Sequence, residues 1–136
     1  MRHLGPGEED LVVQAAHLFD GPPRLDAVQR FLADPAHHLF IAYLDGGPVG
    51  FVSGVELTHP DKGTEMFLYE LAVDERYRER GIGTALSNAL RALAVELGCY
   101  DMWVLTDADN DAALGTYRKS GATESSTHVM LTWPLT

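Results

Sequence analysis

The chain has 136 residues, of which 46% are hydrophobic, so one core can be buried and a single domain, 1–136, is expected. Twenty acidic and ten basic side chains give a formal charge of −10, which disfavours nucleic acids and anionic membranes as partners and suits a cationic ligand. No signal peptide or bilayer-spanning apolar run is recognisable, and Cys99, the single cysteine, cannot form an internal disulfide. A cytoplasmic protein is expected, and the scattered histidines predict no metal site.

The first half of the chain predicts two helices followed by three strands. Apolar residues keep helical spacing over 8–19 and again over 25–32, and each helix is stopped by proline. The runs 38–44 and 49–57 are separated by a glycine-rich turn, which predicts a β-hairpin. A further strand is expected over 66–73.

The second half alternates helices and strands. A long helix is predicted from residue 82 to residue 97, with Gly98 as its C-terminal cap. A strand over 102–106, a helix over 110–119 and a last strand over 127–133 follow. The fold class is therefore α/β, with a mixed central sheet flanked by helices.

A cationic glycine loop lies between the strand 66–73 and the long helix. Residues 76–86 read RYRERGIGTAL. The first N–H groups of a helix lack internal partners and carry about half a positive charge, so this loop suits a phosphate or diphosphate, although glycine turns before helices are often only structural. Arg78 and Arg80 can add charge-assisted hydrogen bonds. The spacing excludes a Walker loop, and Leu86 stands where a dinucleotide fingerprint needs glycine or alanine.

The spacing Arg78-x-x-Gly81-x-Gly83 resembles motif A of the GCN5-related N-acetyltransferases (GNAT), in which this loop holds the pyrophosphate of acetyl-coenzyme A. The resemblance covers roughly residues 36–133 and includes a strand end and a later N-x-x-A-x-x-x-Y-x-K-x-G helix, here Leu71-Ala72-Val73 and then Asn110, Ala113, Tyr117, Lys119 and Gly121. It implies a GNAT fold with splayed strands. Departures at Gly115, Thr116 and Ala122 affect local packing.

A narrower resemblance is to the type I aminoglycoside 3-N-acetyltransferases, in which an aspartate often stands at the position of Glu70. It rests on five segments, 4–6, 40–42, 69–73, 97–100 and 107–121. This resemblance implies an aminoglycoside as the small cationic amine substrate, and a homodimer is common among such proteins.

The resemblance also implies which residues hold acetyl-coenzyme A, with no metal required. They are Leu71, Ala72, Val73, Arg78, Arg80, Gly81, Ile82, Gly83, Thr84, Asn110, Ala113 and Tyr117. Asn110 is equally suited to be the N-cap of its helix.

Acetyl transfer to an amine needs a proton acceptor for the amine and a proton donor for the leaving thiolate. Glu70 is the candidate general base, with an exposed structural glutamate as the alternative, and Tyr117 is the candidate general acid, with a core tyrosine as the alternative. The acidic run that contains Asp107 and Asp109 could bind a polycation or be a solvated helix start. His128 matches a histidine of the aminoglycoside enzymes, and Asp20 and Glu65 are weaker substrate candidates.

Three functions remain open from the sequence. The first is acetylation of an aminoglycoside amine, and the second is the same reaction on another small amine, a polyamine or a protein N-terminus. The third is a non-catalytic acyl-coenzyme-A-binding regulatory module, which predicts a degraded acid or base position. Glu70 and Tyr117 are both present, so an enzyme is favoured.

Overall fold

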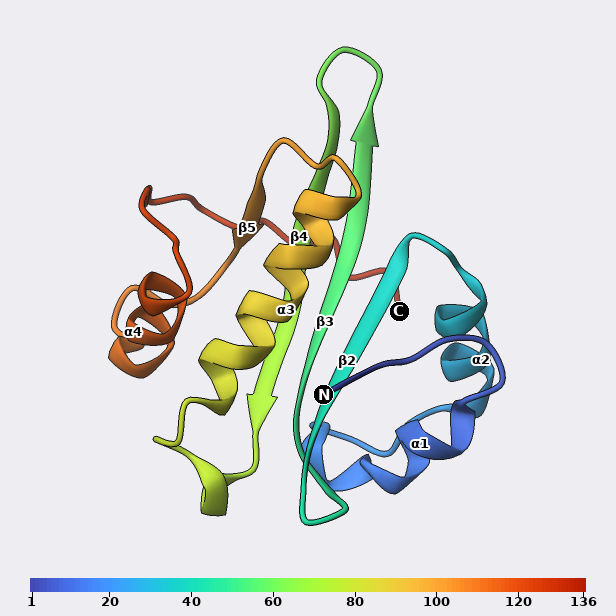
Figure 1. The fold of residues 1–136 in the computed structure, drawn as a ribbon. Coiled ribbons are helices and arrows are strands. Elements are labelled where there is room, and N and C mark those ends of the chain that lie inside the picture. Colours follow the sequence, from blue (N-terminus) through green and yellow to red (C-terminus); the bar gives the residue numbers. More distant parts are fainter.

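A computed structural model describes all 136 residues and contains one five-stranded sheet (Figure 1). The strand order is β1-β2-β3-β4-β5, and only β4 and β5 are parallel neighbours. The mixed sheet expected from the sequence is confirmed. The strands are β1 (Arg2–His3), β2 (His37–Leu44), β3 (Gly47–His59), β4 (Gly63–Val73) and β5 (Met102–Val104).

Four α-helices and two short 3₁₀ turns accompany the sheet. The expected helix over 8–19 is instead a short helix followed by a 3₁₀ turn, while the other three predicted helices are present within a few residues of their expected ends. The helices are α1 (Glu9–Gln14), α2 (Leu25–Ala33), α3 (Ile82–Glu96) and α4 (Asp111–Lys119), and the 3₁₀ turns are η1 (Ala16–Leu18) and η2 (Glu75–Tyr77). None of the helices is long and apolar enough to cross a lipid bilayer.

The sheet has a separate hydrophobic core on each face. Side chains alternate along β2 and β3, so Ile41 and Phe51 pack with α1 and α2, whereas Ala42 and Val52 pack with α3. In Figure 1, α3 crosses the near side of the sheet and α4 lies beyond β5. The two cores hold β4 between helices on both faces, which fixes the strand that carries the candidate base.

The two-residue strand β1 was not predicted, because so short an element leaves no periodicity. It pairs with β2, and the His3 ring stacks on Phe40 with centroids 4.4 Å apart. His3 Nε2 lies 3.2 Å from His38 Nδ1, and His38 Nε2 lies 2.8 Å from Glu56 Oε2. This chain of contacts joins the N-terminus to β2 and β3.

The parallel strands β4 and β5 separate soon after they meet. β5 pairs only with residues Met66 to Leu68, so the five residues of β4 that follow, 69–73, have an open edge on that side. The splayed strands implied by the GNAT resemblance are thus present.

The strand predicted over 127–133 is wrong, because no strand forms after α4. A strand needs a partner, and this segment pairs neither with the short edge strand β5, which has three residues, nor with any other strand. Figure 1 shows the C-terminal segment, in red, leaving α4 without joining the sheet. Its apolar side chains are consequently exposed.

Candidate active site

The glycine loop presents bare backbone at the start of α3. Gly81 is the N-cap residue with φ of 80°, a left-handed conformation that suits glycine, and Glu79 also has a positive φ of 63°. The N–H groups of residues 82–84 have no acceptor in the chain, and no atom lies within 4 Å of a Cβ built on Gly81. An anion can therefore approach these N–H groups, as the sequence predicted for a phosphate.

Three arginines lie in or next to this loop, and each has a different interaction partner. Arg76 forms an ion pair with Asp74 at 3.0 Å, and Arg78 Nε donates to the carbonyl oxygen of Val73 at 3.3 Å. The Arg80 guanidinium lies 5.3 Å from the centre of the Tyr77 ring and has no carboxylate partner. Arg80 is therefore the cation most available to an anion, while Arg78 also ties the loop to the end of β4.

Gly83 marks the point where the loop, β4 and α4 meet. A Cβ on Gly83 would lie 3.2 Å from Thr116 Cγ2 and 3.7 Å from side-chain carbons of Leu71 and Val73. The structure thus brings together three groups of residues that the sequence assigned to the coenzyme, from the loop, the strand end and the helix of Tyr117. Gly83 itself is constrained by packing, which sequence spacing could not distinguish from a ligand contact.

The open edge of β4 carries unpaired backbone groups. Asp74 N–H donates to the Val49 carbonyl at 2.8 Å, so the alternation of an antiparallel strand turns the N–H groups of Val73 and Leu71 away from β3. β5 does not extend far enough to meet them. These donors suit the amides and the thioester carbonyl of a pantetheine arm.

A β-bulge redirects Glu70. Tyr69 is an extra residue where the register with β3 shifts, and Leu68 and Leu71 consequently pack in the same core although they are three positions apart. Tyr69 and Glu70 both line a cavity on the α1 and α2 side of the sheet. The bulge, and not simple alternation, therefore sets the direction of the candidate base.

The cavity beside Glu70 has a volume of about 410 Å³. Its walls are mainly apolar, and its acidic residues are Asp20 and Glu70. Burial, and to a smaller degree the charge of Asp20, raises the pKa of Glu70. A raised pKa brings a carboxylate closer to the value that suits a general base near neutral pH. The lining includes Phe19, Pro22, Pro23, Arg24, Phe31 and Tyr69.

Tyr117 lies on the other side of β4 from Glu70. It is half-buried on α4, lines a second cavity between α3, β5 and α4, and has a pKa raised by burial. Its hydroxyl makes no hydrogen bond within the chain. Asn110 is the N-cap of α4, as predicted, because its Oδ1 accepts from Ala113 N–H at 3.1 Å. Its side-chain NH₂ remains available to a ligand.

The other substrate candidates lie apart from Glu70. Asp107 and Asp109 are exposed in the loop before α4, and neither lines either of the two cavities. His128 is exposed and paired with Ser126 at 2.7 Å. Glu65 accepts a hydrogen bond from Tyr100 near the start of β4. Of the weaker candidates, only Asp20 shares the cavity with Glu70.

Sequence reasoning missed the apolar wall of the Glu70 cavity. Phe19 and Phe31 fit the helical core pattern, and Pro22 and Pro23 were interpreted only as a helix stop. The one available signal was the position of Asp20. It lies between an apolar helix and two prolines, where a carboxylate contributes neither to a helix face nor to a core.

The geometry can be compared with known proteins. A model of the acetyltransferase (GNAT) family matches residues 9–122. The chain belongs to the GNAT family. The match includes the glycine loop, Glu70 and Tyr117, so the GNAT resemblance found in the sequence is confirmed, whereas the type I 3-N specificity remains a prediction.

The curated relatives are longer proteins. Mycothiol acetyltransferase of Salinispora arenicola is 38% identical over 89 residues, which cover 63% of this chain and 27% of that protein. Spermidine N(1)-acetyltransferase of Escherichia coli is 26% identical over 97 residues, covering 71% and 50% respectively. An acetyltransferase of Yersinia pestis is 33% identical over 97 residues, covering 71% and 64%. This GNAT chain thus spans less than two thirds of these relatives.

Solved structures share the GNAT fold across nearly the whole chain. An aminoglycoside acetyltransferase from an uncultured soil metagenomic sample, in complex with sisomicin, has a TM-score of 0.90 at 24% identity and covers 99% of this chain and 95% of its own. The aminoglycoside N-acetyltransferase AAC(6')-Iy, in complex with coenzyme A, has a TM-score of 0.79 at 21% identity and covers 97% and 92%. These likenesses establish the fold.

Proposed function

We propose that this GNAT chain transfers an acetyl group from acetyl-coenzyme A to a primary amine. The observation that carries the proposal is the convergence at Gly83, where the unpaired N–H groups of α3, the open edge of β4 and α4 meet. Glu70 lies on the same strand, immediately before Leu71, and faces a separate cavity large enough for a small molecule. Coenzyme and acceptor would therefore approach β4 from different sides.

The coenzyme supplies an acetyl thioester when it is bound. Its diphosphate would accept hydrogen bonds from the N–H groups of residues 81–84 and from Arg78 and Arg80. Donors on the strand segment 71–73 would orient the pantetheine and polarise the carbonyl group. Asn110 and Ala113 would contact the same arm from the start of α4.

Glu70 would remove the proton from the acceptor amine. An amine with a pKa of about 10 is neutral in only about one molecule per thousand at pH 7, so its deprotonation costs roughly 4 kcal/mol. Glu70 lies in a partly desolvated position with a raised pKa, which favours proton acceptance, directly or through water.

Tyr117 would hold the proton that the leaving thiolate needs. Burial raises its pKa, so the phenol stays protonated throughout the neutral range. Its hydroxyl has no partner within the chain and is free to donate. The apolar surroundings of Tyr117 also disfavour a charged thiolate, which would favour proton transfer from the phenol to the sulfur.

An aminoglycoside is the first candidate acceptor, acetylated at a 3-amino group as the sequence resemblance suggests. The net charge of −10 favours a polycation, and structural neighbours include enzymes described as aminoglycoside acetyltransferases. In this proposal Asp107, Asp109 and His128 would bind amino groups remote from Glu70.

The walls of the cavity favour a second candidate acceptor, a small amine carried on an apolar body. Phe19, Phe31 and Tyr69 offer aromatic surface, whereas the carboxylates are limited to Asp20 and Glu70. One ammonium group can be neutralised there without further acidic contacts. A relative is described as a spermidine acetyltransferase, so linear polyamines belong in the same comparison.

The test is release of coenzyme A thiol with acetyl-coenzyme A and a panel of aminoglycosides, polyamines and arylalkylamines. We expect turnover of at least one primary amine and a loss of kcat of about 10²-fold or more in Glu70→Gln. Circular dichroism should show an unchanged fold.

Two outcomes would overturn parts of this proposal. Tight coenzyme binding without acetylation of any amine would favour the non-catalytic acyl-coenzyme-A-binding module. Full activity of Glu70→Gln would leave the transferase assignment intact and make Glu70 a structural glutamate.

A further inference from the structure

The cavity beside Glu70 carries charges of both signs. Arg24, the N-cap residue of α2, is the one cation among the residues that line it, and Asp20 and Glu70 are its two acids. A cavity that bound only an ammonium group would be better served by acids alone, because a guanidinium group repels another cation. The arginine therefore indicates an acceptor that carries a negative group together with its amine.

The Arg24 guanidinium is available to such a ligand. Its contact with Asp26 is 3.4 Å long, and the two side chains are 79% and 75% exposed. An ion pair so open to water stabilises the chain little, and it leaves the other guanidinium N–H groups free. Asp26 itself does not line the cavity. Arg24 can therefore bind an anion in the cavity with little loss elsewhere.

The first turn of α2 adds backbone donors beside Arg24. The N–H groups of residues 25–27 have no acceptor within the chain, and the first helical bond runs from Val28 N–H to the Arg24 carbonyl at 2.8 Å. Ala27 also lines the cavity, so this turn borders it. An anion at Arg24 would thus also meet the positive end of the helix dipole. A carboxylate suits this place better than a phosphate, because a single arginine stands against the two acids of the same cavity.

The other walls of the cavity fit an apolar side chain. Phe19 stacks on Phe51 with ring centroids 4.4 Å apart, and both line the cavity together with Phe31. An apolar cavity of about 150 Å³ can hold benzene, so the cavity of about 410 Å³ has room for an aromatic ring and its polar groups. Ser53, opposite Glu70 in the register of β3 and β4, is 8% exposed and lines the same cavity. Its hydroxyl can accept a hydrogen bond from an ammonium group at Glu70.

We propose that the acceptor is an amino acid with an apolar or aromatic side chain, whose carboxylate binds Arg24 and whose α-amine lies at Glu70. This inference rests on the proposed acetyl transfer and names its substrate class. The ammonium group loses one proton to Glu70 and a second one as the C–N bond forms and the thioester C–S bond breaks. Tyr117 protonates the departing sulfur, and the second amine proton restores the phenol. The products are an N-acetyl amino acid, coenzyme A and one released proton.

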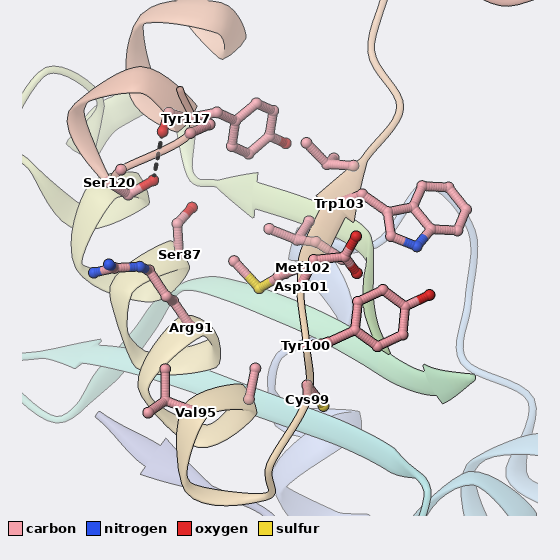
Figure 2. Close-up of a pocket in the computed structure, with 15 residues that line it drawn as sticks. Ser87, Arg91, Val95, Cys99, Tyr100, Asp101, Met102, Trp103, Tyr117 and Ser120 are labelled. Carbon is pink, nitrogen blue, oxygen red and sulfur yellow. Dashed lines mark hydrogen bonds between the residues drawn. The ribbon is translucent and has the colours of Figure 1, made fainter. Parts of the chain in front are cut away.

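The cavity beside Tyr117 does not offer a second place for this acceptor. Figure 2 shows its polar residues, among them Arg91 on α3 and Asp101 just before β5. An amine bound there would lie on the other side of β4 from Glu70 and would lack the candidate base. Arg24 shares a cavity with Glu70, whereas Arg91 does not.

Matched acceptors test the role of the carboxylate. Phenylalanine and leucine are compared with phenylalaninol and leucinol, in which an alcohol replaces the carboxylate and the amine and side chain are kept. The parent should acetylate at least one of the two amino acids with a kcat/KM about tenfold or more above that of its alcohol, as charge-assisted contacts at a partly exposed site would give. Arg24→Gln should abolish this preference by raising KM for the amino acid, and it should leave the alcohol unaffected.

Arg30→Gln is the matched control, because it removes an exposed arginine of the same helix that does not line the cavity. It should keep the preference of the parent. Equal kcat/KM for amino acid and alcohol in both pairs, or an equal loss for both acceptors in Arg24→Gln, would overturn the inference and leave acetylation of an amine intact.

Calorimetry distinguishes failure of this inference from failure of the proposed function. If no amine is acetylated, the transferase proposal fails, and binding in the presence of coenzyme A still decides whether the cavity takes an amino acid. Phenylalanine should then bind the parent about tenfold more tightly than phenylalaninol and lose that advantage in Arg24→Gln. Equal affinities of the parent for the two molecules would overturn the inference.

Discussion

Glu70 and Asp20 reach the same cavity from different parts of the chain, the first from the bulged strand β4 and the second from the loop after η1. Burial raises the pKa of Glu70 more than Asp20 does, but both act in the same direction. A like charge disfavours ionisation of its neighbour. Asp20 thus helps to set the pH at which Glu70 becomes a competent base.

We predict that Asp20→Asn moves the acidic limb of the kcat/KM profile to lower pH. Removing the negative charge lowers the pKa of Glu70, so the carboxylate form is available at a lower pH than in the parent. Burial still raises the pKa of Glu70 in this variant, so the acidic limb should stay at a higher pH than for an exposed glutamate. The measurement is the pH dependence of kcat/KM for the best amine of the panel.

Asp107→Asn is the matched control, since it also removes one acidic charge but lies outside the cavity. The acidic limb of the kcat/KM profile of Asp107→Asn should lie at the same pH as that of the parent. An unmoved limb in Asp20→Asn, or equal shifts in both variants, would show that Asp20 does not tune Glu70.

The docking of α3 on the sheet depends on a glycine in β3, Gly54, which has no side chain. A Cβ on Gly54 would lie 2.6 Å from Leu90 Cδ1 and 3.0 Å from Met66 Sδ, both in fully buried side chains. Real side chains do not tolerate the shorter distance, so either Leu90 would have to adopt another rotamer in a closely packed core or α3 would have to shift. Because α3 begins at the glycine loop, its position also sets that of the anion site.

We predict that Gly54→Ala lowers the free energy of unfolding by about 1–3 kcal/mol, as overpacking of a core usually does. Gly115→Ala provides the opposite control, because no atom lies near its Cβ and alanine favours the interior of α4 by about 1 kcal/mol. Urea denaturation of both variants checks the pair. Equal stability of parent and Gly54→Ala would mean that Leu90 repacks freely.

The parts of the fold that depend on local patterns could be predicted from the sequence. The helix at residue 82 and its Gly98 cap follow from apolar spacing and from a glycine that adopts φ of 79°. The strand at 127–133 has an equally good pattern but does not form, because a strand also needs a partner strand and this segment pairs with none. The periodicity of apolar residues shows which side chains share one face of a strand. It cannot show whether another part of the protein packs against that face.

The candidate site could likewise be predicted only where it depends on local sequence motifs. Motif spacing located the loop, the strand end and Tyr117, and the structure brings these together around Gly83. The acceptor cavity could not be predicted, since its walls come from Phe19 and Phe31, which look like ordinary core residues in sequence. Nor could spacing show that Asp107 lies apart from Glu70.

Tyr69 is the extra residue of the bulge in β4, and the pairing of β4 with β3 resumes directly after it. Because the strand resumes in phase after it, removing Tyr69 would keep Leu68 and Leu71 in the same core and restore an uninterrupted ladder with β3. A chain with this single deletion should fold with a melting temperature near that of the parent and keep Glu70 on the cavity side of the strand, so a rise in KM for the amine would report the loss of the Tyr69 side chain from the cavity wall. The sheet is thus complete without Tyr69, and what the extra residue adds is an aromatic wall to the cavity beside Glu70.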